Sequence, residues 1–380
     1  MRQIYLDYNA TTPIAPSIQE AMLPFITEYY GNPSSTHALG RACQEAIEDA
    51  RLQVAGILGA DSDEVIFTSG GTESNNLALK GVMLREPVGS GAHLVISAFE
   101  HPAIEAPAKF LTQLGYELTV VPVNSDGVVE PEAVEAALRP DTKLVSIMHA
   151  NNELGTVQPI REISEICRAR EVLLHTDAAQ TVGKIGTYVN ELGVDLLTVA
   201  GHKLYAPKGV GALFVKQGVA LEPFMHGAGH EGGLRAGTEN TPYIVALGKA
   251  TALAVRGLGE NGDRMAALRD RLLDRLTKGI GDELTVHGAR AERLPNTLSV
   301  NLPRVHGADV LAQIPEICAS TGSACHSGTT NLSASLRAIG LTAEQAQGTV
   351  RLSVGWYTSE EDIDRAASKI LGVWENLVSG

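Results

Sequence analysis

The sequence predicts an α/β protein: a large domain with a mostly parallel central sheet flanked by helices, and a second, small α+β domain. Between about residues 60 and 215, short apolar runs rich in β-branched residues alternate with amphipathic segments. This pattern is typical of strands that are buried on both faces of a parallel sheet. A chain of 380 residues, 44% of them hydrophobic, is long enough for two domains or for one large domain with an appendage.

Short apolar runs are the predicted strands of the large sheet. They are Glu64–Thr68, His93–Ser97, Lys143–Met148, Val172–His175 and Asp195–Val199. Amphipathic sequence separates one run from the next, as expected of strands that alternate with helices.

A long helical pattern follows the large sheet and leads into the small domain. Apolar periodicity extends from Thr241 to Ile280, with an interruption near Gly257 to Gly262, and we expect the chain to cross between the domains here. The small domain is predicted to contain two strands, a short helix between them and a closing helix. These elements are Thr297–Leu302, Val350–Val354, Ala308–Ile314 and Ser359–Leu377.

Charge and cysteine content argue against several classes of protein. Lys plus Arg number 30 and Asp plus Glu number 44, a net charge of −14, so the surface should repel nucleic acid. The sequence has no uncharged apolar span of about eighteen residues and no signal-peptide pattern at Met1–Asp7, which favours a cytoplasmic protein that does not bind membranes. The four cysteines lack disulfide-like or metal-like spacing, as expected of free thiols. They are Cys43, Cys167, Cys318 and Cys325.

A glycine-rich turn follows the first predicted strand. Gly70, Gly71 and Thr72 come directly after the strand, and an expected helix, Ser74–Gly81, begins behind them. Glycines permit close approach of the backbone, and the free N–H groups and positive dipole at a helix start bind phosphate. The alternative is an ordinary strand-to-helix turn in which Thr72 caps the helix. The turn lacks the lysine of a Walker loop, which argues against nucleotide hydrolysis.

Two charged residues follow predicted strands at the carboxyl edge of the sheet, where open parallel sheets bind ligands. Asp177 lies just past Val172–His175. It is a candidate partner for the protonated nitrogen of a pyridine ring, or a helix cap. Lys203 follows Asp195–Val199. It is placed to form a Schiff base with a cofactor aldehyde, or it is an ordinary surface lysine.

His101 and Arg351 are further candidates for proton transfer and substrate binding. His101 follows a predicted strand and precedes Pro102, which is typical of a helix start. Its imidazole is suited to stacking on a planar ring and to moving protons, or it caps the helix. Arg351 alternates with Val350 and Leu352, so its guanidinium points away from them and is available to a substrate carboxylate, or it serves solubility.

The sequence does not predict a metal site. His226, His230 and Glu231 resemble a ligand set, but the glycines at positions 227, 229, 232 and 233 make a helix implausible. A flexible glycine-rich loop is the better description.

Cys325 lies in the middle of a polar segment of the small domain. Within residues 320–331, Ala324 and Cys325 are the only apolar residues. Such a segment cannot bury itself, and we expect it to be mobile. The thiol of Cys325 is therefore expected to be presented to other groups and not packed in a core.

With these residues in place, the chain resembles the cysteine desulfurases of the class V aminotransferase group, in the branch with a long cysteine-bearing loop. The resemblance covers nearly the whole chain, and the joint occurrence of its motifs in this order is far more specific than any one of them. The motifs are Tyr5–Thr12, Gly31–Ser35, Thr68–Asn76, Glu100–Pro102, His149–Glu153, His175–Gln180, Gly201–Lys203, Arg235–Thr238 and Ser320–Cys325.

This resemblance implies a homodimer of the pyridoxal-phosphate-dependent transferase fold, type I. It places the large cofactor-binding domain at residues 15–257. The small domain would comprise residues 1–14 and 258–380 and carry the cysteine loop, residues 320–331.

The resemblance also assigns residues to the cofactor, pyridoxal 5′-phosphate. Lys203 would form the covalent link, Asp177 would pair with the pyridine nitrogen and His101 would stack on the ring. Gln180 and Asn152 would lie near the phenolic oxygen and the substrate.

At the phosphate end, the resemblance implies binding by both subunits. Gly71, Thr72 and His202 would hold the phosphate, and Thr238 would reach in from the other subunit. Ala200 stands where similar enzymes often have a serine, which removes one hydroxyl near this end.

The implied reaction converts L-cysteine to L-alanine. Arg351 would bind the substrate carboxylate, and Lys203 would take the α-proton. The thiolate of Cys325 would then attack the substrate sulfur and become a persulfide, with His101 as the expected base and His326 as a further candidate.

The implied fate of the sulfur is transfer to an acceptor protein. This transfer would serve iron–sulfur cluster assembly, tRNA thiolation or DNA phosphorothioation. The alternatives are a selenocysteine lyase, another pyridoxal-phosphate-dependent aminotransferase, or a scaffold that has kept the fold and lost the chemistry.

Overall fold

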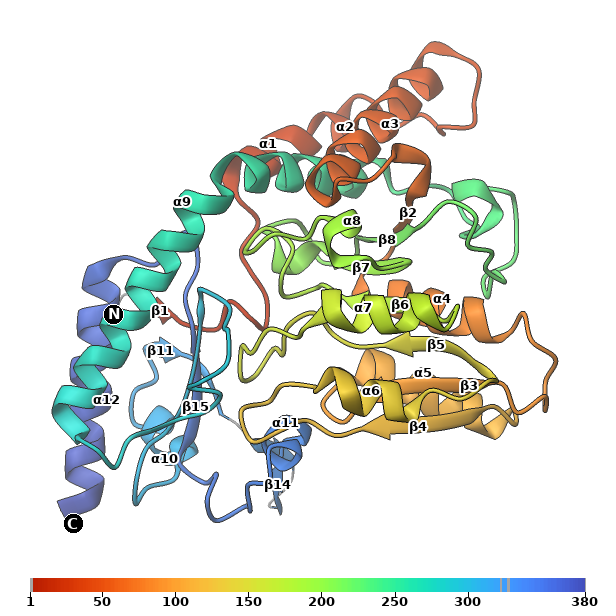
Figure 1. Ribbon diagram of the computed structural model, residues 1–380. Helices are drawn as coiled ribbons and strands as arrows, with labels where there is room; N and C mark the ends of the chain where they lie inside the picture. The colour runs from red at the N-terminus through yellow and green to blue at the C-terminus, as the bar shows by residue number, and fades with distance from the viewer. Residues whose placement is uncertain (1–2, 322, 327–328, 380) are drawn as a thin grey trace.

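The computed structural model describes residues 3–321, 323–326 and 329–379, and for residues 323–326 and 329–331 it describes the backbone without the side chains. Within those ranges, seven strands form a central sheet with helices on both faces, and four strands form a second, smaller sheet (Figure 1). The α/β fold class predicted from the sequence is confirmed.

The central sheet is mostly parallel, as predicted. Its strands are β2 (Val65–Thr68), β3 (His93–Ser97), β4 (Glu117–Val121), β5 (Thr142–Ser146), β6 (Leu173–Asp177), β7 (Leu196–Ala200) and β8 (Gly211–Val215). They lie in the order β2-β8-β7-β6-β5-β3-β4. The strands from β4 to β7 in that order pair in parallel, whereas β8 runs antiparallel to both β2 and β7. The sequence analysis identified every strand of this sheet except β4 and β8.

Helices cover both faces of the central sheet because successive strand residues point to opposite faces and both faces are apolar. The helices before residue 200 are α1 (Pro16–Met22), α2 (Pro24–Thr27), α3 (Ala38–Leu58), α4 (Gly71–Met83), α5 (Pro102–Gln113), α6 (Pro131–Ala137), α7 (Ile160–Ala169) and α8 (Val189–Leu192). On β3, Val95 packs into a core cluster with residues of α3 and α7. Its neighbours Leu94 and Ile96 pack into another cluster with residues of α4 and α5.

The second sheet is antiparallel and draws on the C-terminal part of the chain. Its strands, in spatial order, are β12 (Ser320–Thr321), β15 (Thr349–Ser353), β10 (Thr297–Asn301) and β9 (Thr285–Val286). Helices α10 (Gly307–Ala312) and α12 (Glu360–Ser379) pack beside it, and β1 (Ile4–Tyr5) pairs in parallel with β11 (Ile317–Cys318). One core cluster joins Ile4 and Leu6 to Leu298, Leu352 and Ile363. Both ends of the chain therefore pack together, while the domain boundaries at residues 14/15 and 257/258 remain a prediction.

Helix α9 (Thr241–Ile280) is continuous, so the predicted interruption near Gly257 to Gly262 is wrong. A glycine costs a helix only about 1 kcal/mol relative to alanine, and apolar packing on both sides of the glycines holds the helix together. Leu247 is buried in its first half and Leu272 in its second half. The first half lies beside α3 and the second beside α12 (Figure 1). In the described ranges, neither α9 nor any other helix is long and apolar enough to cross a membrane.

The polar segment that contains Cys325 forms short strands. After β12, strand β13 (Ser323–His326) pairs with β14 (Thr329–Leu332) as an antiparallel hairpin in which Cys325 lies opposite Thr330. The short helix α11 (Ala334–Ala338) follows. The side chains of Cys325 and His326 lie outside the described residues, and the mobility of this segment remains a prediction.

Candidate active site

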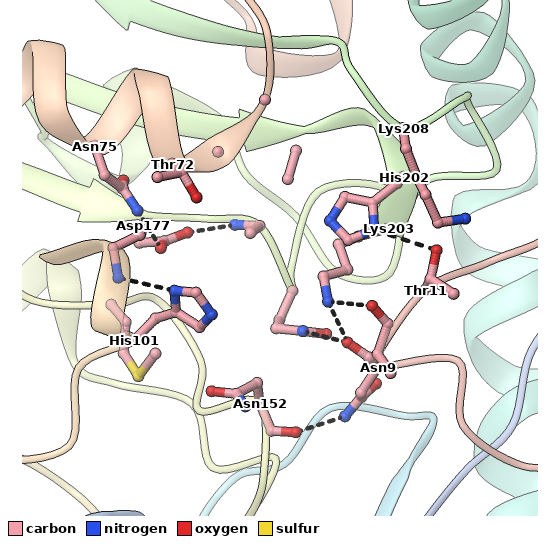
Figure 2. Close-up of a pocket in the computed structure, with 18 of the residues that line it drawn as sticks. Asn9, Thr11, Thr72, Asn75, His101, Asn152, Asp177, His202, Lys203 and Lys208 are labelled. Carbon is pink, nitrogen blue, oxygen red and sulfur yellow. Dashed lines mark hydrogen bonds between the residues drawn. The ribbon is translucent and has the colours of Figure 1, made fainter.

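A cavity of about 720 Å³ opens at the carboxyl end of the central sheet, where β6 and β7 end (Figure 2). The first turns of α4 and α5, the N-terminal residues 9–11 and strand β15 complete its wall. Most of the predicted site residues line it. These are Gly71, Thr72, His101, Asn152, Asp177, Gln180, His202, Lys203 and Arg351. Thr238 is not among the described lining residues, and the side chain of Cys325 lies outside the description.

Asp177 is the last residue of β6, and neighbouring donors fix its carboxylate. Its Oδ2 accepts a hydrogen bond of 2.7 Å from Asn75 Nδ2, and its Oδ1 accepts one of 3.0 Å from the Ala179 N–H (Figure 2). Its carboxylate therefore faces the cavity as a fixed acceptor, and its contact with the Ala179 N–H also caps the helical turns that follow β6. Asn75 was not among the predicted site residues. Asn75 lies in the helix after β2, and nothing in the local sequence indicates that its side chain reaches β6.

Lys203 ends a single 3-10 turn, η2 (Gly201–Lys203), that follows β7 directly. Its Nζ donates to the carbonyl oxygens of Asn9, at 2.5 Å, and Ala10, at 2.7 Å (Figure 2). Burial lowers the pKa of Lys203 to about 8, and the positive charge of Arg351 adds to that shift, while Asp177 opposes it. About a tenth of Lys203 therefore carries an uncharged, nucleophilic amine at pH 7, far more than for an ordinary lysine.

His101 both caps a helix and faces the cavity, so the two interpretations of this residue do not exclude each other. It is the N-cap of α5, and its Nδ1 accepts a hydrogen bond of 3.1 Å from the Ala103 N–H. The neutral ring therefore carries its proton on Nε2. Burial lowers its pKa, and Lys203 lowers it further against the opposing effect of Asp177. At neutral pH the imidazole is uncharged, as a base or a ring-stacking group requires.

The glycine-rich turn opens α4 at another side of the cavity. Gly70 precedes the helix with a φ of 143°, a conformation that favours glycine. A Cβ atom at Gly71 would lie 3.2 Å from the Cβ of Ala200, so a side chain there would crowd the start of the helix. Thr72 is the second residue of α4, so the alternative that Thr72 caps the helix is wrong. The helix also begins before the predicted Ser74, because Gly71 and Thr72 adopt its first turn.

Further polar groups surround that helix start. His202 Nδ1 lies 3.2 Å from Thr11 Oγ1 (Figure 2), and burial, aided by Lys203 and Lys208, lowers the pKa of His202 to about 4. Lys208 lines the same cavity and brings a positive charge to it. The sequence analysis gave no role to Thr11 or Lys208. Lys208 directly precedes Gly209, and a lysine beside a glycine-rich segment could have indicated a role in phosphate binding.

Arg351 enters the cavity from β15, on the face opposite its buried neighbours Val350 and Leu352. One terminal nitrogen, Nη2, donates to Asp7 Oδ1 at 2.7 Å and to Ser320 Oγ at 3.0 Å, and Nη1 donates to the Asn152 carbonyl oxygen at 3.1 Å. Its Nε is buried and has no partner among the described residues. The guanidinium therefore keeps hydrogen-bonding capacity for a ligand.

The other cysteines of the described chain lie away from the cavity wall. Cys43 and Cys167 are buried, and Cys318 on β11 is partly buried. Burial raises the pKa of Cys167 to about 12, which makes it a poor nucleophile at neutral pH. In the described ranges, no group of three or more His, Cys, Asp or Glu side chains is arranged to hold a metal ion.

The fold and the cavity define an enzyme of the aminotransferase type. The chain belongs to the family described as Aminotransferase class-V, whose model matches residues 4–366. The resemblance stated from the sequence is thereby confirmed.

Individual proteins and solved structures are similar to this chain over nearly its whole length. The chain is 45% identical over 378 residues to "Cysteine desulfurase IscS" of Dictyoglomus turgidum, covering 99% of this chain and 95% of that protein. Among solved structures, a "NIFS-LIKE PROTEIN" matches with a TM-score of 0.91 and 37% identity over 98% of this chain and 100% of the other. A structure titled "SspA in complex with cysteine" matches with a TM-score of 0.82 and 35% identity over 93% of this chain and 99% of the other.

Enzymes of this family use pyridoxal 5′-phosphate, and the cavity contains the groups that this cofactor needs. Asp177 is a fixed carboxylate for the ring nitrogen, and Lys203 is a partly buried amine for the aldehyde. The glycine-containing start of α4 offers N–H groups to a phosphate. Asn75 Oδ1 is a buried oxygen without a partner among the described atoms, so the site still contains a hydrogen-bond acceptor that is not used. The residues therefore fit the cofactor.

Proposed function

We propose that the protein is a cysteine desulfurase, which takes the sulfur from L-cysteine, releases L-alanine and holds the sulfur as a persulfide on Cys325. The observation that carries this proposal is the presence of Lys203, Asp177 and Arg351 in one cavity. An anchoring amine, a carboxylate for the ring nitrogen and a cation for a substrate carboxylate are the groups that amino-acid chemistry on pyridoxal phosphate needs. The names of the relatives support cysteine as the amino acid.

The proposed binding roles divide the cavity into a cofactor end and a substrate end. Bound pyridoxal phosphate supplies an electron sink for the negative charge that remains when a proton leaves the substrate Cα. Asp177 keeps the ring nitrogen protonated, and His101 lies against the ring. Arg351, assisted by Asn152, binds the substrate carboxylate through its guanidinium, whose Nε has no partner among the described residues.

The cofactor's phosphate is proposed to lie at the start of α4. Gly71 and Thr72 offer N–H groups and a hydroxyl there, and His202 lies beside them. Lys208 adds a positive charge. Because Ala200 brings no hydroxyl to this end, the backbone groups of α4 carry a larger share of the phosphate binding.

Lys203 is proposed to move the substrate's α-proton. Its pKa of about 8 leaves a usable fraction of free amine at neutral pH, and the carbonyl groups of Asn9 and Ala10 orient it. His101 is the proposed base for the thiol. Because its Nδ1 accepts from the Ala103 N–H, this role requires the ring to give up that contact and carry its proton on Nδ1, which frees Nε2 to accept the thiol proton. His326 stays a second candidate from the sequence.

The sulfur transfer itself is assigned to Cys325. Its thiolate attacks the sulfur of the substrate, the bond between that sulfur and the substrate Cβ breaks, and the Cβ gains a proton to become the methyl group of alanine. The sulfur remains on Cys325 as a persulfide. The position of Cys325 in a polar hairpin next to β12 supports this role, because β12 pairs with the strand that carries Arg351.

A comparison of cysteine variants tests the proposal. We expect Cys325→Ser to abolish alanine formation from L-cysteine and persulfide formation on the enzyme, whereas an aminotransferase would keep its activity after this substitution. Cys318→Ser is the matched control, since Cys318 is a partly buried thiol of the same domain, and should retain both. Alanine formation that survives Cys325→Ser would contradict the assignment. Preference for selenocysteine over cysteine in the same assay would favour the lyase alternative.

We further propose a homodimer in which Thr238 of the partner subunit completes the phosphate site. Thr238 lies beyond a 3-10 turn, η3 (Glu231–Gly233), that a buried ion pair fastens to the body of the protein: Arg51 Nη1 lies 2.7 Å from Glu231 Oε2. This arrangement would hold the glycine-rich segment in place for a second subunit. Sedimentation of the holoenzyme as a monomer would contradict the dimer.

The final step is transfer of the persulfide sulfur to an acceptor protein. Iron–sulfur cluster assembly, tRNA thiolation and DNA phosphorothioation are the proposed destinations. The net charge of −14 favours a protein partner over direct contact with nucleic acid. Capture of an acceptor by the persulfidated enzyme, with none captured by Cys325→Ser, tests this step.

A further inference from the structure

Lys184 is a buried lysine directly behind the cavity. Its exposed fraction is 8%, and it follows Gln180 by four residues in a run of helical turns. This spacing places both side chains on one side of the turn. Lys184 also lines a small internal cavity together with Lys203 and Tyr205. It therefore lies between the proposed cofactor site and the core, where charged residues are rare.

A chain of hydrogen bonds connects Lys184 to the proposed cofactor lysine. Lys184 Nζ donates to Gln180 Oε1 at 3.1 Å, and Gln180 Nε2 donates to the Asn9 carbonyl oxygen at 3.0 Å. The same carbonyl oxygen accepts a hydrogen bond of 2.5 Å from Lys203 Nζ. The orientation of the Gln180 amide is thus specified at both ends.

The amine of Lys184 is costly to bury. The neighbouring charges that act on it are those of Lys203 and Arg351, both positive, and burial lowers its pKa to about 7. A buried amine without an opposite charge destabilises a protein relative to an apolar side chain of similar length. Packing alone would therefore favour a residue such as methionine here, and a role for the amine must lie in its hydrogen bond.

We propose that Lys184 is a positioning residue: by donating to Gln180 Oε1, it holds the Gln180 amide with its Nε2 toward the cavity, as a donor to the phenolic oxygen of bound pyridoxal phosphate. This inference rests on the proposed function, which places Gln180 beside that oxygen. With Lys184 in place, a flipped amide would turn its N–H groups toward the amine and its oxygen toward the Asn9 carbonyl oxygen. The two oxygens would repel each other, and the protonated amine has no lone pair to accept the N–H groups, so the flipped state is disfavoured.

The substitution Lys184→Met tests this role, because it removes the donor and keeps an unbranched side chain of similar length. We expect pyridoxal phosphate to dissociate about fivefold to tenfold faster, as for the loss of one oriented hydrogen bond. The thermal midpoint of the apoprotein should stay unchanged or rise. Lys143→Met is the control: Lys143 has a half-exposed side chain on β5, and its substitution should change neither quantity. A lower thermal midpoint with unchanged dissociation would show a purely structural lysine and overturn the proposal.

A double-mutant cycle identifies the route through Gln180. If Lys184 acts through that amide, adding Lys184→Met to Gln180→Leu should leave cofactor dissociation as it is in Gln180→Leu alone. Additive effects would overturn the proposal. These measurements follow cofactor release and need no turnover of cysteine. A wild-type enzyme that makes no alanine would therefore refute the proposed function alone, and normal retention of the cofactor by Lys184→Met would refute this inference alone.

Discussion

The cofactor end and the substrate end of the cavity are built in different ways. At the cofactor end, Asp177 is the last residue of a buried strand of the central sheet and Lys203 follows another, and neutral donors and acceptors of the chain fix them. At the substrate end, Arg351 comes from the small sheet and is held by a carboxylate, that of Asp7. A ligand carboxylate is chemically the same as this partner and can share or replace it. The cofactor end is therefore fixed before ligands bind, whereas at the substrate end a ligand carboxylate can take the place of a protein carboxylate.

The largest expected effect is at the substrate end. Arg351→Ala should weaken the binding of L-cysteine by about 2–5 kcal/mol, because a buried charge loses its partner, and KM should rise accordingly. Arg351→Lys should recover little of this, since an ammonium group lacks the planar fork of a guanidinium. Cofactor content, measured by absorbance, should stay normal. An unchanged KM together with loss of the cofactor would contradict the assignment of Arg351 to the substrate end.

The pH dependence of cofactor binding sharpens the comparison at the other end. Lys203 must be uncharged to react with an aldehyde, and burial lowers its pKa to about 8. The rate at which the apoprotein combines with pyridoxal phosphate should therefore rise with pH and level off above about pH 8. Between pH 6 and pH 9 we expect a roughly hundredfold increase, tenfold for each pH unit below the pKa. A rate that keeps rising to pH 10 would indicate an ordinary, solvated lysine.

Asn75 should matter for the cofactor and not for the substrate. Asn75→Leu removes the 2.7 Å hydrogen bond to Asp177, and a hydrogen bond to a charged group contributes about 1.5–3 kcal/mol. We expect the affinity for pyridoxal phosphate, measured by equilibrium titration, to fall by a corresponding amount while KM for cysteine changes little. Asn190→Ala, at an exposed position on α8, is the control. Equal effects on both ligands would contradict the separation.

The smallest effect concerns the sheet beneath the cofactor end. His175 is fully buried on β6 between Ser146 and Thr198, and burial lowers its pKa to about 3. The folded protein keeps this ring neutral while the unfolded chain takes up a proton below about pH 6.5, so stability falls as the pH drops. His175 alone should remove about 1 kcal/mol from the free energy of unfolding between pH 7 and pH 5.5.

Denaturant titrations at the two pH values measure this share as the difference between the wild type and His175→Gln. The glutamine keeps a polar side chain but does not titrate, so its stability should depend less on pH. An identical pH dependence in both proteins would mean that the ring is not held neutral.

The sequence predicted those residues of the candidate site that come directly after predicted strands. Asp177, Lys203 and His101 come directly after apolar runs, and the carboxyl ends of parallel strands meet at one edge. Asn75 and Lys184 could not be found in this way. The partner of Asn75 is distant in sequence, and the partner of Lys184 lies one turn away. In the sequence, polar residues at such positions look like ordinary helix residues.

The same limit explains the errors in the fold. Glycines at 257, 259 and 262 signal a break, yet α9 continues through them, because its two halves pack against different helices. Strand β8 was not predicted, because it returns antiparallel next to β7 and the glycine-rich segment before it resembles a loop.

By itself, the sequence determined the alternation of apolar strands with helices, and hence a parallel sheet with a ligand site at its carboxyl edge. Its ordered motifs also pointed to the family. The tertiary structure alone decided which polar groups meet: Asn75 with Asp177, Asp7 with Arg351, and Lys184 with Gln180. The physical reason is one of range. Periodic apolar patterns act within each element, whereas the partner of a buried polar group is chosen when distant segments pack together.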